Sequence, residues 1–179
     1  MLRTLVSATA LAVVAASASF AGEGDVSWSA GYTAFDVTDS GTGVSVGAVT
    51  FRGGYEFSRH FGFEGQLDIG VDSDTVVVLA TPVDLELNWA ASLFGVARAP
   101  VTDNVNLFGR LGYTSAEVEA SVPGVSFADD ASGIAYGVGA EAFFDGRNGF
   151  RAEYTRHEFD DASADAWSIT YVRRFGGNR

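Results

Sequence analysis

Carboxylates and arginines are the side chains in this sequence that could do chemistry. The chain has 179 residues, with 23 Asp or Glu, 11 Arg, 2 His and no Cys or Lys, and a formal net charge of −12. The lack of Cys excludes disulfides and thiolate metal sites. Nucleic-acid binding needs a basic surface, so the acidic balance argues against it. His60 and His157 are far apart in the sequence, so no transition-metal site is expected.

Acidic residues gather in segments that read as loops. Such carboxylates could hold Ca²⁺ or Mg²⁺, or they could form a solvated acidic rim, which is the interpretation favoured here. The glycines of "GVGAEA" sit inside a strand pattern with no helix behind them, so they do not predict a phosphate site. No metal or cofactor is expected. The acidic groups are Asp36/Asp39, Asp72/Asp74, Asp129/Asp130 and Asp160/Asp161/Asp165.

The elements that position the charged side chains are strands. After residue 25 apolar and polar residues alternate with period two, which is the pattern of a strand with two unlike faces. Strands of this length suit a membrane crossing, which takes about 9–11 residues, better than a soluble sheet. Eight strands are predicted, at about residues 26–37, 44–57, 61–72, 83–98, 105–116, 133–144, 150–159 and 166–175.

The connections between these strands alternate in length. "SRH", "APVTDN" and "DGRNG" are short, whereas "TDSGTG", "SDTVVVLATP", "EVEASVPGVSFADDAS" and "DDASAD" are mostly longer and rich in Asp, Gly and Ser. Short turns at one end and longer loops at the other are typical of a transmembrane barrel. The fold class predicted is therefore all-β, an eight-stranded antiparallel up-and-down transmembrane β-barrel.

The composition of the polar rows indicates which face points inward. These rows are full of Gly, Ala, Ser and Thr, whereas a soluble surface carries about 25–35% charged residues. The apolar rows, including Leu87 and Trp89, are therefore assigned to lipid, and Glu64, Gln66 and Asp68 to the lumen. A secreted lipocalin-like barrel, with the faces reversed, is the weaker alternative.

An eight-stranded barrel is only wide enough for its interior to be filled by side chains, and buried charges must be paired. Gly137 and Gly139 are expected to leave room for Phe94, Phe108 and Phe143. Acids outnumber bases in the polar rows, so some acids are expected to be protonated, hydrated or near a mouth. The predicted lumen charge network is Arg52, Glu56, Glu64, Asp68, Glu86, Arg110, Glu141, Arg151 and Glu153.

Two further features concern the membrane and export. Aromatic residues near the strand ends predict an interfacial girdle. The girdle residues are Phe57, Phe61, Phe144, Phe150, Trp167 and Phe175.

The first 21 residues contain Arg3, an apolar stretch and Ser19-Phe20-Ala21. They predict a signal peptide cleaved after Ala21, which leaves a barrel domain at 22–179.

Four stretches together resemble the small outer-membrane β-barrel family of Gram-negative bacteria, the OmpA/OmpX-like barrels. They are "RGGYEFSRHFGFEGQLDIG", "NLFGRLGY", "GVGAEAFFDGRNGFRAEYTRHEF" and "WSITYVRRF". The resemblance implies location in the outer membrane. It also implies contact with lipid and lipopolysaccharide, whose phosphates divalent cations could bridge to the acidic loops. Phe175 would be the terminal aromatic read by the barrel-assembly machinery, although "GGNR" follows it and Arg173 replaces an apolar residue.

Some barrels of this size are enzymes, and lipid A deacylases use a His followed two residues later by Ser. Here His157 is followed by Glu158 and Phe159, so His157 is interpreted as a histidine near a strand end at the interface. We therefore expect a monomer that is not an enzyme and has a structural or surface-interaction role. A narrow porin-like pore for small solutes is the alternative.

Overall fold

The computed structural model describes residues 24–39, 42–78, 81–122, 125–159 and 162–176. The signal peptide lies outside these residues, so its cleavage after Ala21 stays a prediction. Among the described residues no helix is long and apolar enough to cross a membrane. The strands are β1 (Asp25–Asp39), β2 (Thr42–Glu56), β3 (Phe61–Gly70), β4 (Ser73–Val78), β5 (Thr81–Pro100), β6 (Val105–Val122), β7 (Val125–Phe143), β8 (Asn148–Phe159) and β9 (Ser163–Phe175).

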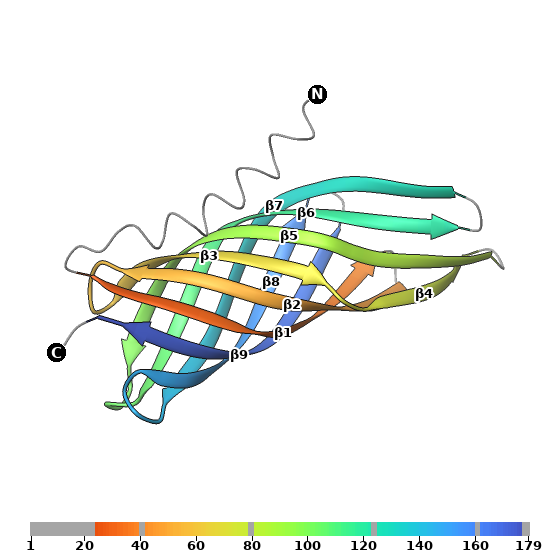
Figure 1. Ribbon diagram of the computed structural model, residues 1–179. Helices are drawn as coiled ribbons and strands as arrows, with labels where there is room; N and C mark the ends of the chain where they lie inside the picture. Colours follow the sequence, from red (N-terminus) through yellow and green to blue (C-terminus); the bar gives the residue numbers. More distant parts are fainter. Residues whose placement is uncertain (1–23, 40–41, 79–80, 123–124, 160–161, 177–179) are drawn as a thin grey trace.

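The strands form one antiparallel sheet that closes on itself (Figure 1). Neighbours in the chain pair with each other except β3 and β4, β1 also pairs with β9, and β3 pairs with β5. β4 follows β3 after a two-residue break and continues the pairing along β5, from Ser73 opposite Glu86 to Val78 opposite Thr81. β3 and β4 therefore occupy one position in the wall, and the predicted eight-stranded barrel is confirmed.

At the long-loop end the sheet extends further than the sequence predicts. The segments expected as loops at about residues 73–82 and 117–132 are largely β4, the start of β5, the end of β6 and the start of β7. β6 and β7 pair as far as Val122 opposite Val125, and Figure 1 shows the ends of β4 to β7 projecting beyond the rest of the wall. Valine-rich segments favour extended chain, so these connections are strand hairpins.

The two faces of the wall differ as predicted. Large apolar side chains cover the outside, including Leu111 at 63% exposure and Ile169 at 69%, whereas Asp68 and Phe94 on the inside are at 0%. A lipocalin-like barrel would have the reverse arrangement. The apolar face of β3 thus meets the surroundings of the barrel, and Glu64, Gln66 and Asp68 point into the lumen.

The predicted assignment of Leu87 to the lipid face is wrong. The pairing of β5 with β6 shifts between Leu87 and Trp89, a β-bulge that leaves Asn88 as an extra residue. An extra residue reverses which side chains point inward. Leu87 is consequently only 6% exposed and packs in the lumen with Ala90 and Ala116.

Candidate functional site

Glu153 of β8 is the centre of a buried ion-pair network in the lumen. Its Oε1 lies 2.7 Å from Arg52 Nη2 and 2.5 Å from Arg110 Nη2, and its Oε2 lies 2.7 Å from Arg151 Nη2. These side chains come from β2, β6 and β8, so the network joins opposite parts of the wall. Because all four side chains are at most 2% exposed, their charges are compensated by one another rather than by bulk water.

Glu64 of β3 forms a second centre towards the short-turn end. Its Oε1 accepts hydrogen bonds from Arg98 Nη2 and Arg151 Nη1, each at 2.6 Å, and its Oε2 accepts one from Arg151 Nη2 at 2.9 Å. Arg151 therefore joins Glu64 to Glu153. Such paired hydrogen bonds between guanidinium and carboxylate also fix orientation.

The ion pairs become longer at the short-turn mouth. Arg174 Nη2 donates to Glu141 Oε2 at 2.8 Å, but Glu56 Oε1 is 3.7 Å from both Arg98 Nε and Arg174 Nε. Both Nε atoms are buried without a hydrogen-bond partner among the described residues. The mouth is thus held less tightly than the Glu153 and Glu64 centres.

Asp68 is tied to the network without a salt bridge to any described residue. Thr50 donates to Asp68 Oδ1 at 2.5 Å, and Gln66 Nε2 donates to Oδ2 at 2.7 Å. The other end of the same amide, Gln66 Oε1, accepts hydrogen bonds from Arg52 Nε at 2.8 Å and Arg110 Nη1 at 2.7 Å. Gln66 therefore couples the Asp68 carboxylate to two arginines.

Five arginines and five acids form the ion-pair and hydrogen-bond network of the lumen. The arginines are Arg52, Arg98, Arg110, Arg151 and Arg174, and the acids are Glu56, Glu64, Asp68, Glu141 and Glu153. Asp25 lies opposite Glu56 on the same face of the wall, at the short-turn mouth. The expected surplus of acids also counted Glu86, whose side chain lies outside the described part of the structure, so the surplus stays a prediction.

Strand alternation places on the inward face both Arg98 and Arg174, which the predicted network omits. Arg98 shares the parity of Ser92 and Phe94, and Arg174 shares that of Ser168 and Thr170. Of the predicted network residues, only Glu86 has a side chain outside the described part of the structure. The structure brings the other eight together.

Aromatic rings fill the space between the guanidinium groups. Arg110 lies over Phe94 with Cζ 4.0 Å from the ring centroid, Arg151 over Phe108 at 3.9 Å, and Arg174 over Phe143 at 3.8 Å. These distances allow cation–π attraction in a desolvated setting.

Gly139 leaves room for one of these rings, as expected, whereas Gly137 leaves room for Thr155. A Cβ added to Gly139 would lie 2.4 Å from Phe108 Cζ, and one added to Gly137 would lie 2.7 Å from Thr155 Oγ1. Such approaches are closer than van der Waals contact permits, so the small residues let the lumen pack.

An apolar layer lies on the long-loop side of the network. It consists of Phe35, Val46, Ala48, Leu87, Ala90, Ala116 and Ala166, all of them buried. We call this set the apolar cap.

His157 lies beside the cap, with its ring centroid 5.7 Å from that of Phe35. It is only 2% exposed, so the interpretation of His157 as an interfacial residue is wrong. The strand alternation that places Arg151, Glu153 and Thr155 inside also places His157 inside.

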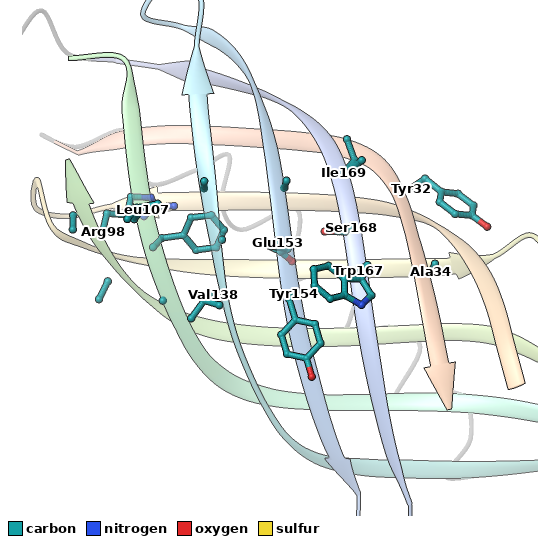
Figure 2. Close-up of a pocket in the computed structure, with 17 residues that line it drawn as sticks. Tyr32, Ala34, Arg98, Leu107, Val138, Glu153, Tyr154, Trp167, Ser168 and Ile169 are labelled. Atoms are coloured by element: carbon teal, nitrogen blue, oxygen red, sulfur yellow. The ribbon is translucent and has the colours of Figure 1, made fainter. Parts of the chain in front are cut away.

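The aromatic residues predicted as a girdle all point outward. Phe57 and Phe61 are each 54% exposed, Phe144 65%, Phe150 59%, Trp167 60% and Phe175 44%. Four of them flank the short turns, and Phe175 ends β9 at the same end of the barrel. Trp167 lies further towards the long loops, with its ring 4.8 Å from that of Tyr154 (Figure 2).

The hollow drawn in Figure 2 is lined mainly by outward-facing side chains, although inward-facing Arg98, Phe108, Glu153 and Ser168 also border it. Its volume is about 1180 Å³, and its outward-facing lining includes Tyr32, Leu107, Val138, Tyr154 and Trp167. Side chains of this kind suit contact with hydrocarbon.

Polar groups appear on the outer wall just beyond Tyr154. Arg156 Nη1 lies 2.9 Å from Asp165 Oδ1, and Tyr136 donates to Glu158 Oε1 at 2.8 Å. The apolar part of the wall therefore ends at this level. No group of three or more His, Cys, Asp or Glu within the described ranges is placed to hold a metal ion.

Comparison with solved structures shows the same fold. The crystal structure of Ail from Yersinia pestis with the heparin analogue sucrose octasulfate is 22% identical, covers 86% of this chain and 100% of its own, and has a TM-score of 0.66. OprG from Pseudomonas aeruginosa is 12% identical, with coverage of 86% and 97% and a TM-score of 0.68. Neisserial surface protein A is 9% identical, with coverage of 86% and 98% and a TM-score of 0.66.

A comparison with curated protein sequences gives no significant match. The model of a family described as "Outer membrane protein beta-barrel domain" matches residues 4–175. The closed barrel, its apolar outer wall and this match over most of the sequence show that the chain belongs to the family of outer membrane protein beta-barrel domains.

Proposed function

We propose that this outer-membrane barrel is closed to solutes and acts through its long-loop end, as a surface for cationic partners. The observation that carries the proposal is the distribution of charge. The charges of the lumen network are bound to one another, whereas acidic residues dominate the long-loop end. A protein built to pass solutes would keep its polar groups along an open path, but here they are bound to each other.

Two layers support closure of the lumen. The ion-pair network fills the short-turn half with guanidinium groups, carboxylates and aromatic rings, and the apolar cap fills the long-loop side. An eight-stranded barrel leaves little space beyond that taken by its own side chains. These contacts favour the structural role over the narrow-pore alternative.

The long-loop end is strongly acidic. Arg156 is the single basic residue in its described strand ends and connections. The described short turns, in contrast, carry both Arg59 and Arg147 and both Asp103 and Asp145. The acids of this end whose side chains the structure describes are Asp36, Asp72, Glu117, Glu119, Asp130, Glu158 and Asp165. The sequence adds Asp39, Asp74, Asp84, Glu86 and Asp129, whose side chains lie outside the described part.

This charge decides the class of partner. The structure of Ail contains sucrose octasulfate, a polyanion, but an acidic surface repels polyanions and attracts cations by long-range steering. We infer that this chain has the opposite preference and binds lysine- or arginine-rich segments. The Debye length is about 8 Å at physiological ionic strength, so salt should weaken such binding.

The outer wall supports the remaining parts of the proposal. Lipid and lipopolysaccharide would contact the exposed apolar side chains, with the girdle residues at the interfaces. Phe175 ends β9 and points outward, which suits recognition by the barrel-assembly machinery. We assign no catalytic role, because the described His157 is enclosed in the lumen, and we expect a monomer.

Binding to charged probes tests the proposal. The barrel in nanodiscs is exposed to an immobilised lysine-rich peptide and to immobilised heparin, at low and physiological salt. The peptide should retain the barrel in a salt-dependent manner, and heparin should not. Retention by heparin equal to or stronger than retention by the peptide would contradict the proposed class of partner.

A pair of variants locates the binding surface. Asp36 and Asp72 are exposed residues of the long-loop end, and Asp103 is exposed in a short turn. Asp36→Asn combined with Asp72→Asn should weaken retention by the peptide, whereas Asp103→Asn should leave it unchanged. An equal effect of the two would place the interaction elsewhere.

A further inference from the structure

His157 is a titratable group enclosed in the lumen. It is 2% exposed, and its Nε2 is buried without a hydrogen-bond partner among the described residues. Its ring lies between aromatic side chains, 5.7 Å from Phe35 and 6.2 Å from a stacked Phe159. A neutral imidazole fits this setting, but a charged one would need a partner for each N–H.

The charged groups that act on His157 are already engaged. They are Arg110 of β6, Glu153 of β8 and Asp165 of β9. Glu153 binds Arg110 at 2.5 Å, and Asp165 binds Arg156 at 2.9 Å. A protonated His157 would therefore add a second cation near Arg110 with no unengaged carboxylate among these groups.

Among the described residues, the other neighbours of His157 are uncharged. β1 contributes the ring of Phe35, and the residues paired with His157 on β7 and β9 are Ala135 and Ala164. His157 is also one residue away from the outward-facing Arg156, at the level where the outer wall turns polar. It thus lies at the long-loop rim, within reach of protons from that side.

We propose that His157 is a proton-sensitive latch on the long-loop half of the lumen. When neutral, it packs with Phe35 and the apolar cap. When mild acid protonates it, water must enter to solvate the ring, and the cap loosens. The latch is independent of the nature of the surface partner.

The sign of the pH dependence follows from this arrangement. A histidine in the unfolded chain takes up a proton around pH 6.5, whereas the enclosed ring in the folded barrel does not. Stability is therefore fully present above about pH 6.5 and is lost as the pH falls below it. Between pH 8 and pH 5 this one group should raise the ratio of unfolded to folded protein about 30-fold.

The sequence has only two histidines, so His60, which is exposed in a short turn, serves as a matched control. Urea unfolding in detergent micelles is followed at pH 8 and pH 5 for wild type, His157→Gln, His157→Phe and His60→Gln. Wild type and His60→Gln should show the additional 30-fold change, and both His157 variants should lack it. The same pH dependence in all four proteins would overturn the proposal.

A titration of the wild type covers the case in which neither His157 variant folds. The imidazole proton signals of the folded barrel are followed by NMR from pH 8 to pH 5. The ring of His157 should stay neutral until the barrel loosens. Titration of His157 near pH 6.5 with no change in the signals of Phe35 would refute the latch.

Discussion

Glu153→Gln is the change that most directly probes the ion-pair network. The substitution keeps the shape of the side chain but removes its charge. Glu153 contacts three guanidinium groups at 2.5–2.7 Å, and its side chain is 1% exposed. Removing one partner of a buried ion pair costs about 3–5 kcal/mol, because the remaining charge is left uncompensated.

Three arginines share this carboxylate, so we expect a loss in the upper part of that range. Arg52 would keep its hydrogen bond to Gln66, and Arg151 would keep Glu64. Arg110 would keep hydrogen bonds only to the neutral Thr155 and Gln66. The network would thus carry one excess positive charge, placed chiefly on Arg110.

Glu158→Gln on the same strand is the matched control. Its carboxylate is 53% exposed and lies 3.6 Å from Arg156, a surface pair worth about 0–1 kcal/mol. The free energy of unfolding of both variants is measured by urea titration in detergent micelles. Equal stabilities for Glu153→Gln and Glu158→Gln would show that water screens the lumen charges, and the pore alternative would then be favoured.

Three other predictions concern packing, the lipid face and a turn. Gly139→Ala should cost about 1–3 kcal/mol in urea unfolding through overpacking against Phe108, whereas Gly109→Ala, whose nearest neighbour would be 3.9 Å away, should cost little; equal losses would contradict the packing described. Leu111→Arg should make the free energy of folding into liposomes about 2–4 kcal/mol less favourable and so lower the folded yield. A yield equal to that of wild type would mean that Leu111 does not face lipid. Hydrogen bonds from the Asn148 side chain and from the backbone N–H groups of Asn148 and Arg147 lower the pKa of Asp145, so its stabilisation should be present at neutral pH and disappear below about pH 4; an Asp145→Asn variant with the same acid dependence as wild type would show that this turn contributes nothing.

The sequence predicts the wall of the barrel well because alternation is a local signal. In strands such as Phe61–Gly70, successive side chains alternate between an apolar and a polar environment. The type of each residue therefore indicates which face it lies on. The bulge at Asn88 breaks this rule. No residue around Leu87 marks the extra position, so the shift depends on pairing with β6, which a single strand does not reveal.

The sequence could predict which residues form the lumen network, but not which acid pairs with which arginine. Alternation identifies which charges point inward, Arg98 and Arg174 included. Which carboxylate meets which arginine depends on the stagger of strands far apart in the sequence, as for Arg52 and Glu153. The extended β4–β5 and β6–β7 hairpins were missed because Asp, Gly and Ser in the long connections suggested loops.

Current through single barrels in planar lipid bilayers tests the central claim, that the lumen is closed and the protein acts at its surface. The account predicts that wild-type barrels inserted at neutral pH give no steady current in high salt. A stable current that scales with salt concentration would contradict it, because ions would then pass the Glu153 centre and the apolar cap in the native state.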